Sequence, residues 1–558
     1  MITTFPFRIR RRHLVAALAV ATLAAGVAAS ANDGLHAHAF HFYPGNLVVS
    51  RSVYDDKASN VRIGEVLPPN CPPISGACGA SGGALYDGTY PYVWNNVLYD
   101  ASFGITSRIF LDQITPNGWL IDTLEVPNSL RPSTREGELV TSFSSKSELA
   151  LHLSLDGRYL SFMGYVAPVN TIDASNANTP LAQDDTNPDG LSFYRAVALL
   201  DRNGHFRFTE TNAYSGNNGR AAIYNNVHGA NVFYTVGNAG NGANPQPDGV
   251  ILGAGAQYIV PSPLPESLQN PAAPTPLASF SIAALGAKAD KIGKDDNFRG
   301  ITVFNNVVYV TKGSGSNGVN TVYFVDTTGK ACPNGVGVPV AGAPLPTSAL
   351  SYNASTLQTA GLPTNMCVLA GFPATPNKTA KTLSYPSAMW FADADTLYVA
   401  DEGDGYAGGA DLYTHAAAQT TAGLQKWVFN AATQSWQLAY TLQAGLNIGQ
   451  PYSVSGYPTG TNAATGLPWS PATDGLRQIT GRVDADGKAT IWAVTSTVSG
   501  NGDTGADPNK LVAVRDTLSN TAAATAADER FVTLRSAKFG EVLRGVSFAP
   551  GTDAPDGH

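Results

Sequence analysis

The sequence predicts an all-β fold, a six-bladed β-propeller, and three observations support this prediction. Short apolar runs recur six times along the 558 residues, beginning at Leu47, Arg158, Asn231, Val307, Thr396 and Thr490. Five of these runs follow a partner segment and a tight turn rich in Asn, Asp or Gly, so the repeating unit is a β-hairpin. The composition, with 57 Gly, 36 Pro and 14% charged residues, is typical of a turn-rich β domain. A seven-bladed ring is the alternative.

Four strands can be drawn around each run, one blade after another. The first blade takes the run at 47–54 and the hairpin at 108–126. Blade two then extends from about Glu148 to about Ala213, and the next four blades are expected to begin near Arg220, Arg299, Tyr385 and Arg477. The last strand, 542–550, has no partner after it. We therefore expect it to complete the first blade beside the 47–54 strand, because closing the ring leaves only short protected edges.

Residues 32–558 are thus predicted to form one propeller domain. Strands such as 396–402 are apolar at successive positions, because a blade is covered by neighbouring blades on both faces. The segment LYVADEGDGY from Leu397, followed by GLQKWVF from Gly423, resembles the NHL-type propeller repeat, and the whole chain is similar to a group of exported bacterial propeller proteins without assigned function. This resemblance implies the fold alone, since the related propellers include lactonases, lyases and binding modules.

The N-terminal 31 residues have the order of a cleaved export signal. Arg8 and Arg10–Arg12 precede an apolar run at 14–25, and a small-residue site ends at Ala31. The run is too short for a permanent membrane span, so we expect a periplasmic or secreted mature chain, monomeric and without a transmembrane anchor. Cleavage removes four arginines and changes 34 basic and 42 acidic residues to 30 and 42, a net charge of −12. This charge argues against nucleic acid as a partner.

The cysteines predict disulfide bonds. An even number of cysteines in an exported chain favours disulfides over metal ligands. The four cysteines form two local pairs, Cys71 with Cys78 and Cys332 with Cys367, and no His lies near either pair in the sequence. We therefore expect two disulfide bonds, each restraining a loop.

The connections between the second and third strands of the predicted blades are long, at 55–107, 166–194, 401–423 and 497–508. In a propeller these connections emerge on one face, and loops on a rigid scaffold are where function concentrates. The first loop contains Tyr90, Tyr92 and Trp94, whose rings could stack on sugars. The alternative is that these rings pack the loop against its own blade.

The second long loop contains the start of a calcium-binding pattern. Asp185, Asn187 and Asp189 precede Gly190, and alternating side-chain oxygens of this kind suit a hard cation. Ala196 stands where the pattern needs Glu, so a solvated acidic turn is the alternative. Calcium is the cofactor that the sequence indicates, and no motif for a nucleotide or an organic cofactor is present.

Arginine occupies the start of four predicted innermost strands, at Arg220, Arg299, Arg477 and Arg544. This position would place four guanidinium groups near the central channel, on the face that has the long loops. Guanidinium groups bind carboxylates or phosphates in a bidentate manner, so the pattern predicts an anion site. The alternative is a ring of internal ion pairs that connects the blades, with partners Asp295, Asp296, Asp474 and Glu541.

The third long loop offers candidates for proton transfer. His415 lies near Asp411 in the sequence, and histidine titrates close to neutral pH, so it is the preferred general base. Asp401, with Glu402 and Asp404 after it, offers carboxylates for acid–base chemistry or cation binding. The alternatives are an exposed loop histidine and a solvated acidic loop.

Together these features predict a secreted propeller that binds an extracellular anionic or carbohydrate-like ligand, a small molecule or a polysaccharide, on its loop-rich face. The first alternative is a propeller enzyme of the lyase or lactonase and hydrolase kind, with calcium at the channel mouth and His415 or Asp401 as the acid–base residue. The second is an envelope scaffold that binds another protein. Ligands that converge on a metal at the channel mouth would favour the enzyme, and a large exposed apolar patch would favour the scaffold.

Overall fold

The computed structural model describes residues 40–553 of the chain, except for the internal segments 55–104, 132–136, 144, 146–147, 173, 176, 181–191, 239–254, 263–277, 283–296, 315–317, 333, 348–363, 463–464 and 502–503. Phe40 ends a first compact unit, Met1–Phe40, and the account below concerns the second unit, His41–His558. Several predictions fall outside the described residues: the export signal at 1–31 and the site residues Cys71, Cys78, Tyr90, Tyr92, Trp94, Asp185, Asn187 and Asp189.

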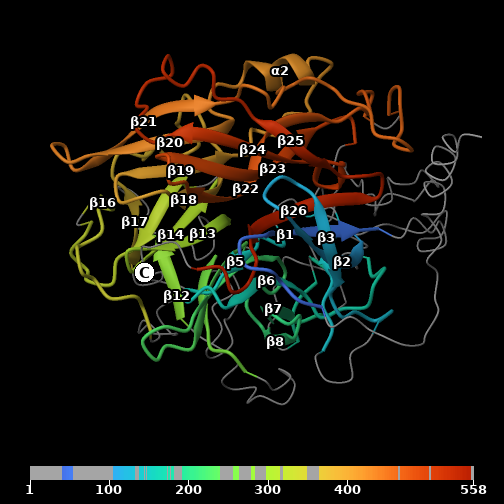
Figure 1. Cartoon of the computed structure of the whole chain (residues 1–558), viewed down its shortest axis with the longest axis horizontal. Coiled ribbons are helices and arrows are strands. Elements are labelled where there is room, and N and C mark those ends of the chain that lie inside the picture. Colours follow the sequence, from blue (N-terminus) through green and yellow to red (C-terminus); the bar gives the residue numbers. More distant parts are fainter. Residues whose placement is uncertain are drawn as a thin grey trace, which may run out of the picture. The chain divides into compact units, whose positions relative to one another are not determined.

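The described strands form six small antiparallel sheets in a ring, which confirms the six-bladed β-propeller (Figure 1). In each blade four strands follow one another from the channel outwards. Blade one contains β26 (Glu541–Phe548), β1 (Leu47–Val53), β2 (Thr106–Ile114) and β3 (Leu120–Glu125). Blade two contains β5 (His152–Leu153), β6 (Tyr159–Tyr165), β7 (Arg195–Asp201) and β8 (Phe206–Thr211). Blade three contains β9 (Gly219–Asn225), β10 (Val232–Gly237), β11 (Ala256–Ile259) and β12 (Ala278–Ile282).

The other three blades repeat this order. Blade four contains β13 (Phe298–Phe304), β14 (Val307–Lys312), β15 (Thr321–Val325) and β17 (Thr364–Leu369). Blade five contains β18 (Pro386–Phe391), β19 (Thr396–Asp401), β20 (Gly423–Asn430) and β21 (Ser435–Leu442). Blade six contains β22 (Ala472–Val483), β23 (Lys488–Val498), β24 (Lys510–Thr517) and β25 (Val532–Ser536). The innermost strands contact one another around the channel in the order β26, β5, β9, β13, β18, β22 and back to β26.

The ring closes as the sequence predicts, because the last strand completes the first blade. β26 pairs antiparallel with β1, from Leu47 opposite Phe548 to Val53 opposite Glu541. β26 also lies close to blade two, where a Cβ atom at Gly545 would be 2.3 Å from the backbone oxygen of Leu149. The N-terminal and C-terminal ends of the domain are therefore joined within one sheet.

The strands between the innermost and outermost positions are buried on both faces, which explains their unbroken apolar runs. β10, β14 and β19 are buried along their whole length. Neighbouring blades share apolar clusters, and Tyr398 and Leu424 of blade five pack with Ile491 of blade six. The core of the domain is therefore a series of layers between blades.

Two outer strands pair in a way that the hairpin repeat does not predict. β12 of blade three lies parallel to β17 of blade four, with Ser281 opposite Thr364 and Ile282 opposite Met366. This contact joins the eight strands of blades three and four into one sheet, and β16 (Val336–Gly337), which pairs parallel with β17, is its ninth strand. A parallel pair covers an outer edge that would otherwise be unpaired.

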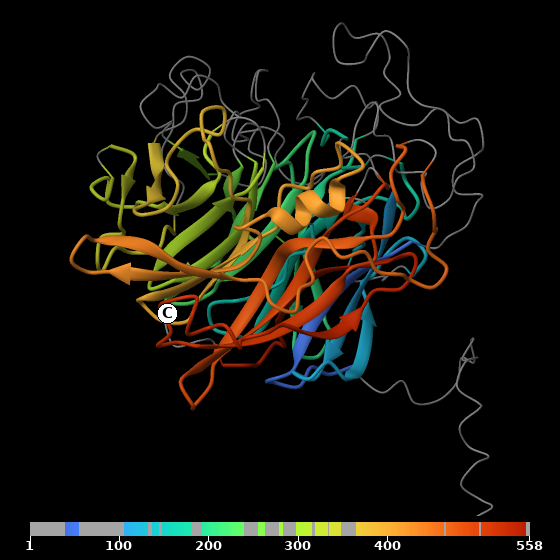
Figure 2. The ribbon, with the colours of Figure 1, turned by 90° about the horizontal axis from the view of Figure 1, so that it is seen from above.

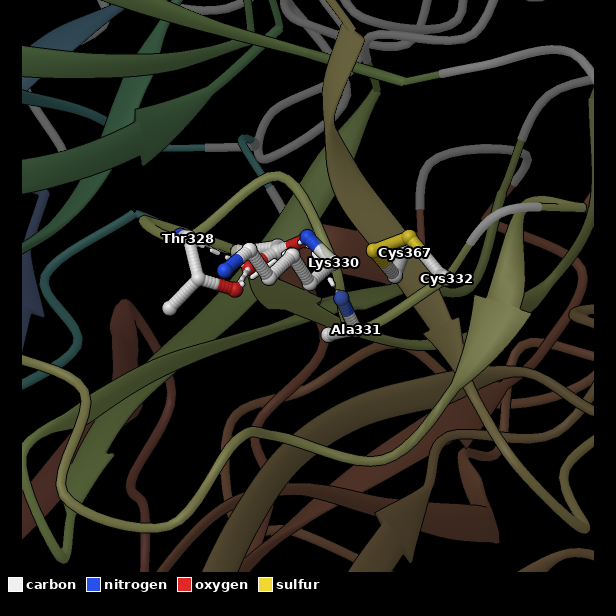
Figure 3. Close-up of a disulfide and its surroundings, with 6 residues drawn as sticks. Thr328, Lys330, Ala331, Cys332 and Cys367 are labelled. Carbon is white, nitrogen blue, oxygen red and sulfur yellow. Dashed lines mark hydrogen bonds between the residues drawn. A yellow bond between two sulfur atoms is a disulfide. The ribbon is translucent and has the colours of Figure 1, made fainter.

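One of the two predicted disulfide bonds is present among the described residues. Cys332 is bonded to Cys367 across 35 residues, so the segment after β15 is attached to β17 (Figure 3). Asp326 lies close to both sulfur atoms, and its carboxylate accepts hydrogen bonds from the backbone of Thr328 and Ala331. Because each sulfur is bonded to the other, this group of three side chains does not form a metal site.

A short helix interrupts the β structure in the third long loop. Helix α2 (Leu412–Ala418) lies on one side of the strands of blades five and six (Figure 2). Leu412 and Ala416 on its inner side pack with Leu467 and Val498, although the helix has no sequence pattern long enough to predict it. None of the described helices is long and apolar enough to cross a membrane.

Candidate functional site

The four arginines of the predicted anion site all belong to innermost strands. Arg220 belongs to β9, Arg299 to β13, Arg477 to β22 and Arg544 to β26. Arg220 and Arg299 are the second residues of their strands, whereas Arg477 and Arg544 lie near the middle of theirs, and all four residues are at most 10% exposed.

Two of the arginines share one carboxylate. The Nε atoms of Arg299 and Arg477 lie 3.3 Å and 3.2 Å from the two carboxylate oxygens of Glu402, one on each. Glu402 directly follows β19 of blade five, so this triad connects blades four, five and six. One carboxylate is thus shared by two guanidinium groups.

The other two arginines bind neutral groups. Arg220 donates to the side-chain oxygen of Asn297 and, at 2.6 Å, to the backbone oxygen of Phe298. Arg544 donates to the backbone oxygens of Phe143 and Ser145 and, at 3.1 Å, to the hydroxyl of Ser52. The arginines therefore also connect blades, as the ion-pair alternative required.

Two of the partners that the ion-pair alternative named have other contacts in the structure. Glu541 pairs with Arg51, 2.8 Å away, on the outer side of β26. Asp474 accepts hydrogen bonds from the backbone of Gly405 at 2.9 Å and from the Gln419 side chain. The carboxylate that pairs with Arg299 and Arg477 is Glu402. Glu402 follows β19 in a loop and does not belong to an innermost strand. Asp295 and Asp296 lie outside the described residues.

Burial and mutual repulsion act on the arginine cluster. Burial lowers the pKa of Arg220 well below its ordinary value, and the charge of Arg299 lowers it further. Burial also lowers the pKa of Arg299, where the repulsion by Arg477 is opposed by the attraction of Glu402. Glu148, which precedes β5 and is hydrogen-bonded to Thr141 and Tyr165, attracts Arg220 from blade two. Burial and the repulsion by Arg299 therefore both disfavour the charged form of Arg220.

The chain between 401 and 405 links the arginine cluster to a second group of side chains. Gly403 lies at a positive φ of 77°, and a Cβ atom there would be 2.4 Å from the carboxylate of Asp474. Glycine is therefore required for the segment to pass so close to β22. The backbone of this segment is fixed by hydrogen bonds from Gly403 to Asp401 and from Gly405 to Asp474. Glu402 and Asp404 are therefore held two residues apart on a fixed segment.

Asp404 and His415 form a carboxylate–imidazole pair. The Nε2 atom of His415 lies 2.6 Å from a carboxylate oxygen of Asp404, and the His415 side chain is 37% exposed. The ring of Tyr406 stacks on the imidazole with a centroid distance of 4.0 Å. The sequence indicated His415 but named Asp411 as its neighbour; Asp411 binds the hydroxyl of Tyr406 instead. Helix α2 brings His415 to Asp404, and nothing in the sequence pattern revealed this contact.

Asp401 is placed differently from its neighbours in the loop. Its side chain is fully buried, and it accepts hydrogen bonds from the backbone of Tyr385 and Gly403 and from Gln425. Burial raises the pKa of Asp401 to about 7, and the nearby charges of Glu402 and Asp474 act in the same direction. Because the carboxyl group is not exposed, Asp401 supports the loop, and His415 is the accessible acid–base residue of the two.

Asp401 predicts a measurable pH dependence of stability. Between the ordinary pKa of 3.8 and about 7 the folded protein binds this proton more tightly than the unfolded chain does, so the contribution to stability decreases as pH rises. The variant Asp401→Asn does not titrate. Its free energy of unfolding relative to wild type should therefore rise from pH 4 to pH 8, by up to roughly 1.4 kcal/mol per pH unit. Thermal and denaturant unfolding at several pH values measure this difference.

Asp112 provides the control with the opposite sign. Although burial alone would raise its pKa, the ion pair with Arg51 lowers it. The stability that Asp112 contributes is present above pH 3.8 and is lost as pH falls, so Asp112→Asn should become less stable relative to wild type as pH rises through the acidic range. A relative stability of Asp401→Asn that stays flat from pH 4 to pH 8 would contradict the role given to Asp401.

Comparison with known proteins adds distant similarities of structure. No protein-family model matches the chain, and no curated protein matches it; the NHL-type resemblance stays a prediction. A polysaccharide lyase of family PL25, an ulvan lyase solved with -[GlcA(1-4)Rha3S]- bound, is 10% identical, with a TM-score of 0.28, and the match covers 79% of this chain and 88% of the lyase. The structure described as that of the ulvan lyase alone is 11% identical, with a TM-score of 0.26 and the same coverage. Similarities this distant do not place residues of the two proteins in correspondence.

Proposed function

We propose that this protein binds an acidic extracellular ligand at the arginine-lined mouth of its channel. The observation that carries the proposal is the cluster of buried arginines. Arg299 lies close enough to Arg220 and Arg477 for their charges to repel, and all three residues are largely buried. Among the described residues, Glu402 and Glu148 attract Arg220. Fixed guanidinium groups in such a site bind carboxylate, sulfate or phosphate more strongly than exposed ones do.

The geometry limits the kind of contact. Because the arginine side chains are at most 10% exposed, only a small acidic group can reach them, so the ligand presents a single carboxylate or sulfate from a larger molecule. An acidic saccharide has this form, and its neutral hydroxyl groups could contact the loops around the mouth. The disulfide between Cys332 and Cys367 supports a location outside the cytoplasm, where such bonds persist.

Titration calorimetry tests the proposal with oligogalacturonides as the acidic probe and maltohexaose as the neutral one. We expect binding of the acidic probe only, weakened about tenfold or more by Arg220→Gln and by Arg477→Gln. Arg482 is the matched control, because it lies near the C-terminal end of the same strand as Arg477 and is 49% exposed. Arg482→Gln should leave binding unchanged. If the arginine variants unfold at lower temperatures yet bind normally, the arginines serve only to connect the blades.

A second candidate function, acid–base catalysis at the same mouth, is favoured by the His415–Asp404 pair. An imidazole that is oriented by a carboxylate and accessible to solvent is a suitable general base. Asp404 of this pair is two residues after Glu402 in the chain, and Glu402 contacts the arginines of the proposed ligand site. Chromatography of the calorimetry mixtures tests this: product that forms with wild type but not with His415→Ala, while binding persists, would establish an enzyme. If the acidic probe stays intact in the presence of wild type, the protein binds the ligand without converting it.

A further inference from the structure

A buried polar cluster lies in the connection between β23 and β24, away from the arginines. Ser499, Asn501 and Asp507 belong to this connection, and Tyr457 reaches it from the segment that follows β21. One carboxylate oxygen of Asp507, Oδ1, accepts hydrogen bonds from the Tyr457 hydroxyl at 2.6 Å, from Ser499 at 3.1 Å and from Asn501 Nδ2 at 3.2 Å. Three donors therefore converge on a single oxygen, and the Thr497 side chain also hydrogen-bonds this carboxylate.

One oxygen of Asp507 and one oxygen of Asn501 in this cluster have no hydrogen-bond partner among the described residues. These atoms, Asp507 Oδ2 and Asn501 Oδ1, are buried. Asp507 is 1% exposed and Asn501 is fully buried, so solvent outside the protein does not reach them. Leaving a buried acceptor without a partner costs about 1–3 kcal/mol, and more when it is charged. Two such oxygens on side chains in contact indicate that the cluster can take a further group.

Asp507 has no cation beside it among the described residues. Two other buried carboxylates do have one: Asp112 has Arg51 and Arg535, and Asp516 has Lys426, whereas Asp401 is buried with neutral donors alone. No ion pair involves Asp507 in the part of the chain that the structure describes. Burial raises the pKa of Asp507 to about 6, and the hydrogen bonds that lower it do not compensate. A buried carboxylate is ordinarily paired or bound to a metal.

We propose that Asp507 and Asn501 bind a calcium ion in the β23–β24 connection of blade six. The donors are a carboxylate oxygen and an amide oxygen, which hard cations prefer, and the cluster contains no sulfur or imidazole ligand for a transition metal. Calcium accepts an irregular set of oxygens, whereas magnesium requires near-octahedral geometry. With a single carboxylate the site belongs to the weak class, with a dissociation constant on the order of 0.1–1 mM, which suits an extracellular protein.

The ion would brace the loops beside the candidate site. Besides Tyr457, the segment after β21 contributes Asn462, whose amide donates to the backbone oxygen of Gly500 at 2.7 Å. Leu467 of the same segment packs against Leu412 of helix α2, which carries His415. Calcium at Asp507 would thus hold together the blade-six connection and the segment on which α2 rests.

The first test uses the intact protein after dialysis against EDTA. We expect CaCl2 to raise the unfolding temperature with a midpoint in the millimolar range, MgCl2 and NaCl to have little effect, and metal analysis to find calcium bound. Asp507→Asn should abolish the response. Asp486→Asn is the matched control, since Asp486 lies in the same blade, is 50% exposed and pairs with Arg515; it should respond as wild type does. A wild type without a calcium response and without bound calcium overturns the proposal.

A second variant gives an effect of opposite sign and does not depend on the stability of Asp507→Asn. Asn501→Asp adds a carboxylate beside Asp507. In EDTA the two buried charges repel, so this variant should unfold at a lower temperature than wild type. In calcium the extra charge should lower the midpoint of the response about tenfold. If Asn501→Asp is destabilised equally with and without calcium, Asp507 and Asn501 do not bind a metal.

The predicted calcium pattern at Asp185, Asn187 and Asp189 needs to be separated from this site. Asp189→Asn should leave the calcium response of the protein intact if Asp507 is the ligand. A response that is lost in Asp189→Asn and retained in Asp507→Asn would place the ion in the other loop and overturn the proposal.

Discussion

Deleting residues 540–558 is expected to destroy the cooperative unfolding transition of the whole domain. The deletion removes β26, which pairs with β1 along its entire length and contacts the innermost strands of blades two and six. Val542, Leu543 and Val546 are almost fully buried, so their loss exposes the apolar faces of three blades. The unpaired edge of β1 would also become a site for aggregation. Circular dichroism and thermal unfolding should show a partly folded, aggregation-prone chain.

A shorter deletion is the control for this experiment. Removing residues 554–558 takes away only the part of the chain beyond the described structure and should leave the unfolding temperature unchanged. A circular permutant that places residues 540–553 before residue 46 should fold, because it restores the β26–β1 pairing. If the deletion of 540–558 melts at the wild-type temperature, β26 does not close the ring in solution.

The substitution Lys426→Met is expected to destabilise the domain by about 3–5 kcal/mol. Lys426 of β20 and Asp516 of β24 form an ion pair of 2.7 Å between blades five and six, and both side chains are 0% exposed. The Lys426 ammonium also donates to the hydroxyl of Tyr440 and to the backbone oxygens of Thr517 and Leu518. Methionine fills a similar volume but leaves the Asp516 carboxylate buried without its cation. Denaturant unfolding measures the loss.

A double-mutant cycle shows whether the loss comes from the stranded charge. Adding Asp516→Asn to Lys426→Met should recover part of the stability, because no buried charge remains, and the two changes should not be additive. Arg515 is adjacent to Asp516 on β24 but is 52% exposed, so Arg515→Met should cost less than roughly 1 kcal/mol. Equal effects of Lys426→Met and Arg515→Met would show that the ion pair is not buried in solution.

Much of the fold follows from local sequence patterns. Apolar runs that continue over successive residues, such as 396–401, occur because blades cover each other on both faces, and the turns between them carry Asn, Asp and Gly. The unmatched strand at 542–550 predicts ring closure by counting alone, since each blade needs four strands. In contrast, the parallel pairing of β12 with β17 depends on where two outer edges meet in space, and no repeat in the chain encodes it.

The candidate site likewise has one part that the sequence predicts and another that only the tertiary structure shows. The four arginines could be assigned to innermost strands from their position in each repeat. Their carboxylate partner could not, because Glu402 lies after the second strand of another blade and reaches Arg299 and Arg477 only when three blades converge. The pairing of His415 with Asp404 likewise depends on helix α2, whose seven residues are too few to form a helix without the apolar contacts below it.

The sequence by itself determined the blade repeat, its closure and the strand positions of the arginines. Strand pairing within a blade and burial between blades produce patterns among residues that are close together in the chain, so these features can be predicted from the sequence. Only the tertiary structure decided which charges meet. Ion pairs, the His415–Asp404 contact and the two unpaired oxygens of Asp507 and Asn501 depend on distances of a few ångströms between loops of different blades. Such distances are set by how the blades pack around the channel, and local patterns carry no information about them.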